Sequence, residues 1–332
     1  MIPDAVFRSA RLAAGAFFMA VLCGFASMVP QTVALREAWP EGVPKRVENQ
    51  TVPFFPQDEY QCGPSALATV LMNSGVEVYP EDLVKAVYIP ERQGSLQAEM
   101  LAAPRQFGRV GYRLEPRYSD LLREVAAGNP VVILQDLGPG PIQKWHYAVV
   151  VGYDYPEGEL YLRSGQHMRE AMPFTMLEYT WKTSNYWAMV ALPPDRVPVT
   201  ANQEAYLSAI TAMERVGDKP SVLAAYKAAL ERWPDSLGAS VGLANQQHAL
   251  GQLKEAEAVL RSAAQRHPDS VVVLNNLAQT LSDQGRNPEA LALIEKASAR
   301  TQREPPLGPA VAAAIADTRA LIVQRMEKTK RR

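Results

Sequence analysis

Cysteine and histidine are scarce in this chain of 332 residues, which has only two cysteines and four histidines. They do not recur at the close spacing that a zinc site needs, so we expect neither a metal nor any other cofactor. The chain also lacks the GxxxxGKS or GxxxxGKT motif that cradles nucleotide phosphates, which excludes an ATPase of that class.

The chain also has no excess of positively charged residues. The formal net charge is −1, so the chain has no overall basic field that would hold nucleic acid. With 47% hydrophobic and 21% charged residues, it is long enough for two ordinary domains. The composition thus predicts a folded protein that does not bind nucleic acid.

A long stretch without charge lies near the N-terminus, from Leu12 to Leu35, directly after Arg8 and Arg11. Such a stretch behind two arginines is typical of a secretory signal or a signal anchor. It predicts that the protein is exported to the periplasm or another extracytoplasmic space and is anchored to the inner membrane. Small side chains up to Ala34 also allow cleavage at that point, so a cleaved signal stays open.

The rest of the chain changes character near position 195. After the leader at residues 1–35, residues 52–195 mix short helical and strand-like segments, whereas residues 203–328 are helix-periodic with almost no strand signal. The proline-rich stretch from Pro193 to Pro198 is typical of a linker. We therefore expect an α+β domain followed by an all-α domain.

The all-α part contains a repeat, because Gly217, Gly251 and Gly285 are spaced by 34 residues. Small or large apolar residues follow the same period: Ala229, Ala263 and Ala297, then Tyr226, Leu260 and Ile294. This pattern resembles the tetratricopeptide repeat, with three repeats at about 203–304 and a capping helix at about 307–328. The resemblance implies a concave surface that binds a peptide or partner protein; the alternative is a stabilising appendage without a ligand.

In the first part, PQDEYQCGPSALATVL at residues 56–71 suggests a nucleophile. Pro64 suits the first turn of a helix, and Gly75 is a stop signal. A buried stripe at helical spacing lies between them: Leu67, Val70 and Leu71. Cys62 would then lie at the helix N-terminus, where unpaired N–H groups favour a thiolate. The alternative is an inert cysteine that packs as a small hydrophobic residue.

Histidine is the natural base for such a thiol. His248 and His267 fall in the repeats, and His167 falls in an apparent turn. His146 opens the apolar run in KWHYAVVVGYD, which predicts a strand whose start can aim an imidazole at Cys62.

The two motifs VPFFPQDEYQCGPSALATVL and WHYAVVVGYD together resemble the papain-like cysteine peptidases of the bacteriocin-processing, double-glycine-leader type, family thirty-nine of that class. The resemblance covers residues 52–195 and implies an α+β papain-like fold. It also implies that Cys62 is the nucleophile, His146 the general base, and Gln57 an amide donor to the oxyanion.

Peptidases of that family have a third catalytic residue, an Asp or Asn in a segment of the type YIxDP. This chain lacks that residue. The corresponding segment reads LYLRSG, which places Ser164 where a carboxylate is expected. We predict that Ser164 or a neighbouring carbonyl orients His146. Asp154, the nearest carboxylate after His146, is the alternative, although its position in GYD also suits a turn.

Two function classes follow from these observations. The first is an exported thiol peptidase that cleaves peptides or protein leaders, with the repeats recruiting the substrate or a partner. The second is a non-catalytic protein in which a degenerate peptidase domain holds peptides and the repeats act as a scaffold.

Overall fold

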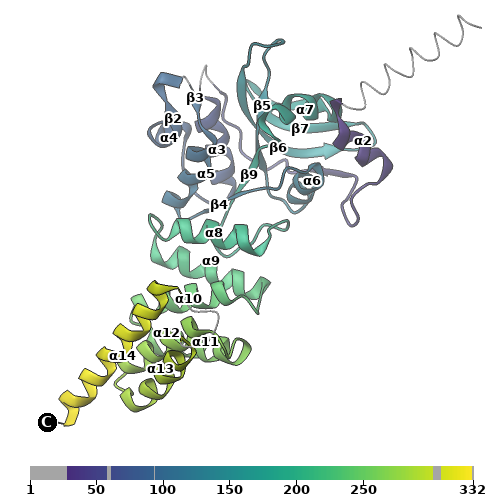
Figure 1. The fold of residues 1–332 in the computed structure, drawn as a ribbon. Coiled ribbons are helices and arrows are strands. Elements are labelled where there is room, and N and C mark those ends of the chain that lie inside the picture. The colour runs from purple at the N-terminus through teal and green to yellow at the C-terminus, as the bar shows by residue number, and fades with distance from the viewer. Residues whose placement is uncertain (1–27, 58–60, 93, 302–307, 331–332) are drawn as a thin grey trace, which may run out of the picture. The chain divides into compact units, whose positions relative to one another are not determined.

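The computed structural model describes residues 28–57, 61–92, 94–301 and 308–330 (Figure 1). They form two compact units. The first takes in the described chain up to Phe107 with residues 111–192 and 198–200, and the second takes in residues 108–110, 193–197 and the chain from Ala201 onward. Most of the predicted leader lies outside the described residues. Within these ranges, no helix is long and apolar enough to cross a membrane.

A sheet forms the centre of the first unit, and β5 pairs antiparallel with β6 and β9, as β6 does with β7 and β7 with β8. Its strands run in the order β4-β9-β5-β6-β7-β8, and β1 pairs with the far end of β6. The strands are β1 (Arg46–Glu48), β4 (Val110–Arg113), β5 (Val131–Asp136), β6 (Trp145–Asp154), β7 (Glu159–Ser164), β8 (His167–Pro173) and β9 (Ala188–Leu192). A separate hairpin joins β2 (Tyr88–Ile89) to β3 (Gly94–Ser95).

Helices lie on both faces of this sheet (Figure 1). They are α2 (Pro30–Glu37), α3 (Cys62–Asn73), α4 (Pro80–Val87), α5 (Gln97–Ala102), α6 (Tyr118–Ala126) and α7 (Phe174–Trp181), with short 3-10 turns at 90–92, 103–107 and 182–184. Because side chains alternate along a strand, Leu134 of β5 joins the core formed with α3, whereas the neighbouring Gln135 donates to Thr180 of α7 at 2.8 Å.

The central helix α3 follows the sequence pattern. The apolar stripe at 67, 70 and 71 is buried against the sheet, and Gly75 ends the helix with a φ of 86°. Gly63 in its first turn is pressed against β3: a Cβ there would come within 2.2 Å of the Ser95 hydroxyl oxygen. Only glycine therefore lets the start of α3 approach the β2–β3 hairpin this closely.

Helix α2 is part of the first unit and lies beside α7 (Figure 1). The backbone N–H groups of Gln31 and Thr32 donate to the two carboxylate oxygens of Glu178 at 2.8 and 2.6 Å. Glu178 is completely buried. The N-terminus of α2 and the Tyr186 hydroxyl, which donates at 3.2 Å, thus supply the hydrogen bonds that make a buried carboxylate tolerable.

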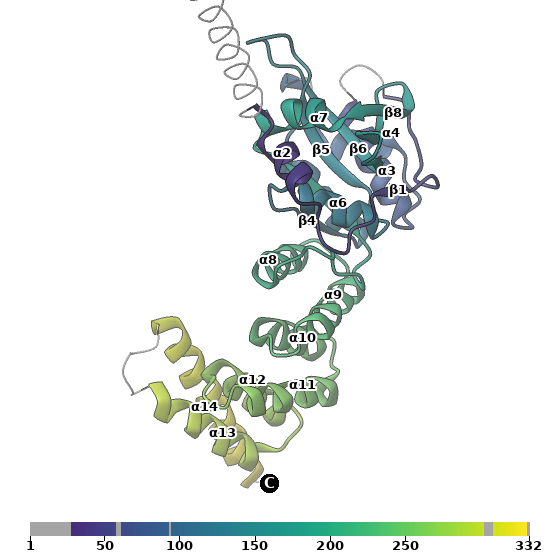
Figure 2. The ribbon, with the colours of Figure 1, turned by 90° about the vertical axis from the view of Figure 1, so that its right-hand side faces the viewer.

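The second unit is all helical and is built from antiparallel pairs followed by one longer helix (Figure 2). The helices are α8 (Gln203–Met213), α9 (Lys219–Arg232), α10 (Leu237–Ala249), α11 (Leu253–Arg266), α12 (Val271–Asp283), α13 (Asn287–Thr301) and α14 (Pro309–Lys330). The repeated small and large positions are all buried, and Gly251 and Gly285 adopt left-handed conformations at the turns, with φ of 75° and 82°. The expected α+β unit followed by a repeat solenoid is confirmed.

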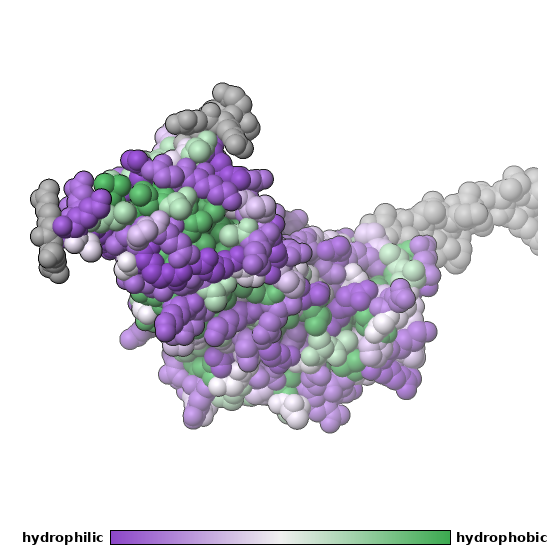
Figure 3. Space-filling model, turned by 90° about the horizontal axis from the view of Figure 1, so that it is seen from below, coloured by the Kyte–Doolittle hydropathy of each residue, from purple (hydrophilic) through white to green (hydrophobic). Residues whose placement is uncertain are grey.

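The face drawn in Figure 3 is mainly hydrophilic, with hydrophobic residues gathered in smaller groups. Buried apolar residues of the second unit instead form a continuous core between successive helices, including Leu260, Leu274, Ile294 and Ile322. Each helix pair therefore depends on its neighbours for burial, and α14 covers the last pair.

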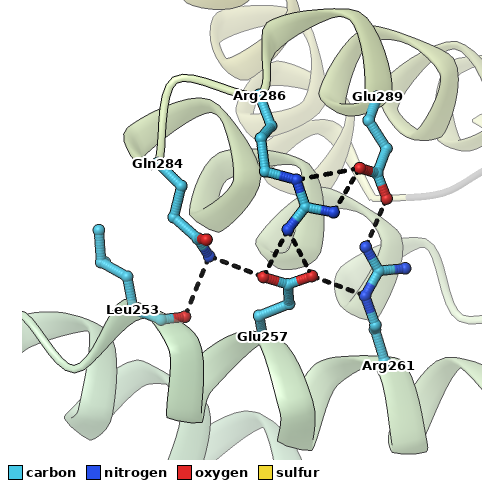
Figure 4. A network of polar contacts seen from close by, with 6 residues as sticks. All are labelled: Leu253, Glu257, Arg261, Gln284, Arg286 and Glu289. Carbon is cyan, nitrogen blue, oxygen red and sulfur yellow. Dashed lines mark hydrogen bonds and ion pairs between the residues drawn. The ribbon is translucent and has the colours of Figure 1, made fainter.

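A polar network joins α11 to the α12–α13 turn and α13 (Figure 4). The Glu257 carboxylate accepts from Arg261 at 2.7 Å, from Arg286 at 2.7 and 2.8 Å, and from Gln284 at 2.9 Å. Glu289 accepts from both arginines. Burial acts to raise the pKa of Glu257, but the hydrogen bonds from the two arginines and Gln284 outweigh it and lower the pKa to about 2.

We expect Glu257→Gln to weaken the contact between these repeats by no more than about 1 kcal/mol, because solvent screens the network. A carboxyl with a depressed pKa stabilises the fold above its ordinary titration range, and this contribution is lost as the pH falls toward about 2. Faster amide hydrogen exchange in α11 and α13 would measure the loss. Glu255→Gln, an exposed change on the same helix, is the control and should leave exchange unchanged.

Candidate active site

Cys62 is the first residue of α3 and is partly buried. The backbone N–H groups of Tyr147, Gly63 and Cys62 itself act to lower the pKa of its thiol. Tyr147 follows His146 in β6, so the start of the helix and the start of this strand meet at the thiol.

The expected thiolate is not favoured by this environment. Burial raises the pKa of the Cys62 thiol, and the backbone N–H groups of Tyr147 and Gly63 offset only part of that effect. The helix N-terminus favours a thiolate, but the sequence by itself does not show that the thiol is desolvated. Burial therefore favours the protonated thiol over the thiolate.

His146 is the second residue of β6 and lies opposite Gln135 of β5. Its Nε2 atom is 3.0 Å from the Ser164 hydroxyl oxygen. Desolvation lowers the pKa of His146; Glu170 acts to raise it and Lys144 to lower it. In the tautomer whose Nε2–H donates to Ser164, a neutral imidazole has Nδ1 left to accept a proton.

Gln57 is buried beside the same part of β6. Its side-chain oxygen accepts from the backbone N–H of Gly165 at 3.1 Å, and its Nε2 donates to the Tyr147 carbonyl at 3.4 Å. An amide donor is thus held next to Tyr147, the strand residue whose N–H acts to lower the pKa of the Cys62 thiol. This position suits a group that stabilises an oxyanion.

The two candidates for the third residue lie in different places. Ser164, buried at the end of β7, contacts His146. Asp154 lies at the opposite end of β6, eight residues or about 26 Å along the strand from His146. It pairs with Arg46 at 3.1 Å and accepts from the Glu157 N–H of the following turn. The structure therefore does not bring the alternative, Asp154, to the imidazole.

We expect Ser164→Ala to lower turnover by about five- to tenfold, the value of one hydrogen bond that orients His146. Ser164→Asp should preserve or raise turnover, because a carboxylate also stabilises an imidazolium. Asp154→Asn should affect unfolding and leave kcat unchanged. The assignment fails if Asp154→Asn removes activity from a folded protein while Ser164→Ala does not; kcat and thermal unfolding of the three variants decide this.

Sequence reasoning missed the turn that follows Ser164. Gly165 exchanges hydrogen bonds with Gln57, and the Gln166 side chain donates to the Gln57 carbonyl at 2.8 Å. The sequence RSGQ predicts a turn. It does not indicate that this turn contacts Gln57, which lies more than a hundred residues earlier in the chain.

The sequence matches the models of two protein families. Residues 49–189 match the model of the Peptidase C39 like family, and residues 220–270 and 247–315 match that of the tetratricopeptide repeat. No curated protein matches the sequence.

Solved structures are similar to each part separately. A C39-like peptidase from Bacillus anthracis is 18% identical, covers 44% of this chain and 97% of its own, and has a TM-score of 0.38. A double glycine motif protease from an AMS/PCAT transporter, solved with its leader peptide, is 22% identical, with 44% and 96% coverage and a TM-score of 0.34. The type III secretion translocator chaperone SycD of Yersinia enterocolitica is 16% identical, with 38% and 94% coverage and a TM-score of 0.35.

The Cys62 and His146 motifs both fall inside the first matched segment, and the helix pairs α10 to α13 fall inside the second. Residues 49–189 of the chain are therefore similar to the C39-like peptidase family, and tetratricopeptide repeats follow them.

Proposed function

We propose that the protein is a thiol peptidase that hydrolyses peptide bonds, with Cys62 as nucleophile and His146 as general base. The observation that carries this proposal is the meeting of three groups around one stretch of β6. The Gln57 amide donates to the Tyr147 carbonyl, the Tyr147 N–H acts to lower the pKa of the Cys62 thiol, and the adjacent imidazole contacts Ser164.

In the first half of the reaction His146 Nδ1 takes the thiol proton as the sulfur attacks the carbonyl carbon of the substrate. The Gln57 N–H stabilises the oxygen that becomes negative. The C–N bond then breaks, the imidazolium returns its proton to the leaving amine, and a thioester on Cys62 remains.

In the second half a water molecule attacks this thioester, with His146 again acting as base. The C–S bond breaks and the proton returns to the sulfur, which releases the carboxylic acid product. Burial raises the pKa of Cys62 and lowers that of His146, and both shifts favour the neutral pair, so we propose that proton transfer accompanies the attack.

A library of peptidyl aminocoumarin amides tests the proposal with the full chain. We expect release of the fluorophore by a subset of the library, and a thioester on the Cys62 peptide in acid-quenched samples by mass spectrometry. Absence of both, with the protein folded, would overturn it.

A binding protein without turnover is the second candidate. It is favoured by the uncharged thiol and imidazole and by a serine in place of a charged orienting group. In that case library peptides would bind, as measured by fluorescence anisotropy, without fluorophore release or thioester.

A peptide or protein substrate is also consistent with apolar side chains at the β5–β6 loop. Leu137, Ile142 and Trp145 are exposed there, and Trp145 precedes His146 in the chain. We propose that the tetratricopeptide repeats bind the substrate protein or a partner on their concave side.

We further propose that the protein is exported and associates with the inner membrane through its N-terminal segment. The support is the uncharged stretch from Leu12 to Leu35 behind two arginines. Cell fractionation should recover the full-length chain with the membrane. A shortened, soluble chain that begins near Leu35 would contradict this proposal.

A further inference from the structure

The turn after Ser164 contacts Gln57 through three hydrogen bonds. The Gln57 N–H donates to the Gly165 carbonyl at 3.0 Å, and the Gly165 N–H donates to the Gln57 side-chain oxygen at 3.1 Å. The Gln166 side chain donates to the Gln57 carbonyl at 2.8 Å. Backbone and side chain of Gln57 are thus held by one short segment.

The bond from Gly165 decides which way the Gln57 amide faces. With its oxygen on the Gly165 N–H, the NH2 group faces the Tyr147 carbonyl, at a longer distance of 3.4 Å. That NH2 group has two hydrogens, so one remains for another acceptor. Rotation of the amide by half a turn would instead present its oxygen, which repels a developing negative charge.

Gly165 can make this bond because of its backbone conformation. Its φ is +56°, in the left-handed region that glycine adopts freely, asparagine tolerates and β-branched residues avoid. An added Cβ would meet nothing within 4 Å. Substitutions at this position therefore change the backbone preference without creating a clash.

We infer that Gly165 is a positioning residue for peptide hydrolysis, which orients the Gln57 amide so that its N–H faces the oxyanion. This inference rests on the proposed function. Ser164, the preceding residue, holds His146. One turn therefore places the base through a side chain and the oxyanion donor through the backbone.

The chain offers a matched control at the other end of β7. Gly158 has a φ of +75° and also has nothing within 4 Å of an added Cβ. It lies in the β6–β7 turn, away from Gln57. Gly158→Val imposes a comparable strain without touching the site, and Gly165→Asn keeps the left-handed conformation at the site.

We expect Gly165→Val to lower kcat at least about tenfold with little change in KM. Gly165→Asn and Gly158→Val should stay near the activity of the unaltered protein. Alkylation of Cys62 by iodoacetamide should not change, because attack on that reagent creates no oxyanion. In a Gln57→Ala background, Gly165→Val should have little further effect, since the group it positions is gone.

Equal losses in Gly165→Val and Gly158→Val, or a full further loss in the Gln57→Ala background, would overturn the inference. A readout that needs no turnover is the side-chain amide signal of Gln57 in protein labelled with 15N-glutamine, assigned by its loss in Gln57→Ala. Gly165→Val should shift this signal and Gly165→Asn should not. If the unaltered protein hydrolyses no peptide, the proposed function is wrong. If the Gln57 signal is unshifted in Gly165→Val, the positioning role of Gly165 is wrong.

Discussion

Cys62→Ala and His146→Ala should each lower peptide turnover at least about a thousandfold, because each removes a group that the reaction needs in both halves. Gln57→Ala should be milder, with a loss of roughly 10²–10³, since it removes one oxyanion donor. Fluorophore release from the best library substrate measures all three.

Thermal unfolding should stay nearly unchanged in these variants. Cys62 and His146 are only partly buried, and truncating a partly buried side chain costs about 1–2 kcal/mol at most. Substantial turnover in Cys62→Ala would sink the thiol mechanism, whereas loss of the folded state would only disqualify that variant; Cys62→Ser then serves as the closer replacement.

The pH dependence follows from the two perturbed groups. Because desolvation lowers the pKa of His146, we expect the imidazole to remain neutral, and turnover to persist, to lower pH than an ordinary histidine allows. Because burial raises the pKa of Cys62, alkylation by iodoacetamide should keep rising on the alkaline side. A plateau of alkylation below neutral pH would instead reveal a preformed thiolate.

A chain that begins at Leu35 should be less stable by about 1–3 kcal/mol, the cost of taking hydrogen-bond donors away from a buried acceptor. Such a chain lacks Gln31 and Thr32, whose backbone N–H groups bond to the buried Glu178 carboxylate. The sequence allows cleavage after Ala34, but that cut would divide α2. We therefore expect any processing to occur before Pro30.

Chemical denaturation of the first unit, followed by tryptophan fluorescence, measures this difference. A chain that begins at Met28 is the matched control and should be as stable as the full chain. Glu178→Gln in the chain from Leu35 should recover part of the loss, because a neutral amide is cheaper to bury. Equal stability of the chains from Met28 and Leu35 would show that α2 does not support Glu178.

Several features of this protein were determined by the sequence alone, because they depend on residues close together in the chain. Pro64, the stripe at 67, 70 and 71, and Gly75 specify α3 and the place of Cys62 at its start. The 34-residue spacing of glycine likewise predicts the repeats, since each helix pair repeats the same local contacts.

Other features were decided only by the tertiary structure, because they depend on burial and on contacts between distant segments. The pKa of the Cys62 thiol is raised, against the local expectation, since desolvation outweighs the helix N-terminus. The contact of Gly165 with Gln57 joins segments 108 residues apart. Neither feature could be predicted from periodicity or spacing, because these patterns describe residues that are close together in the chain. They do not show which distant residues pack together and exclude water.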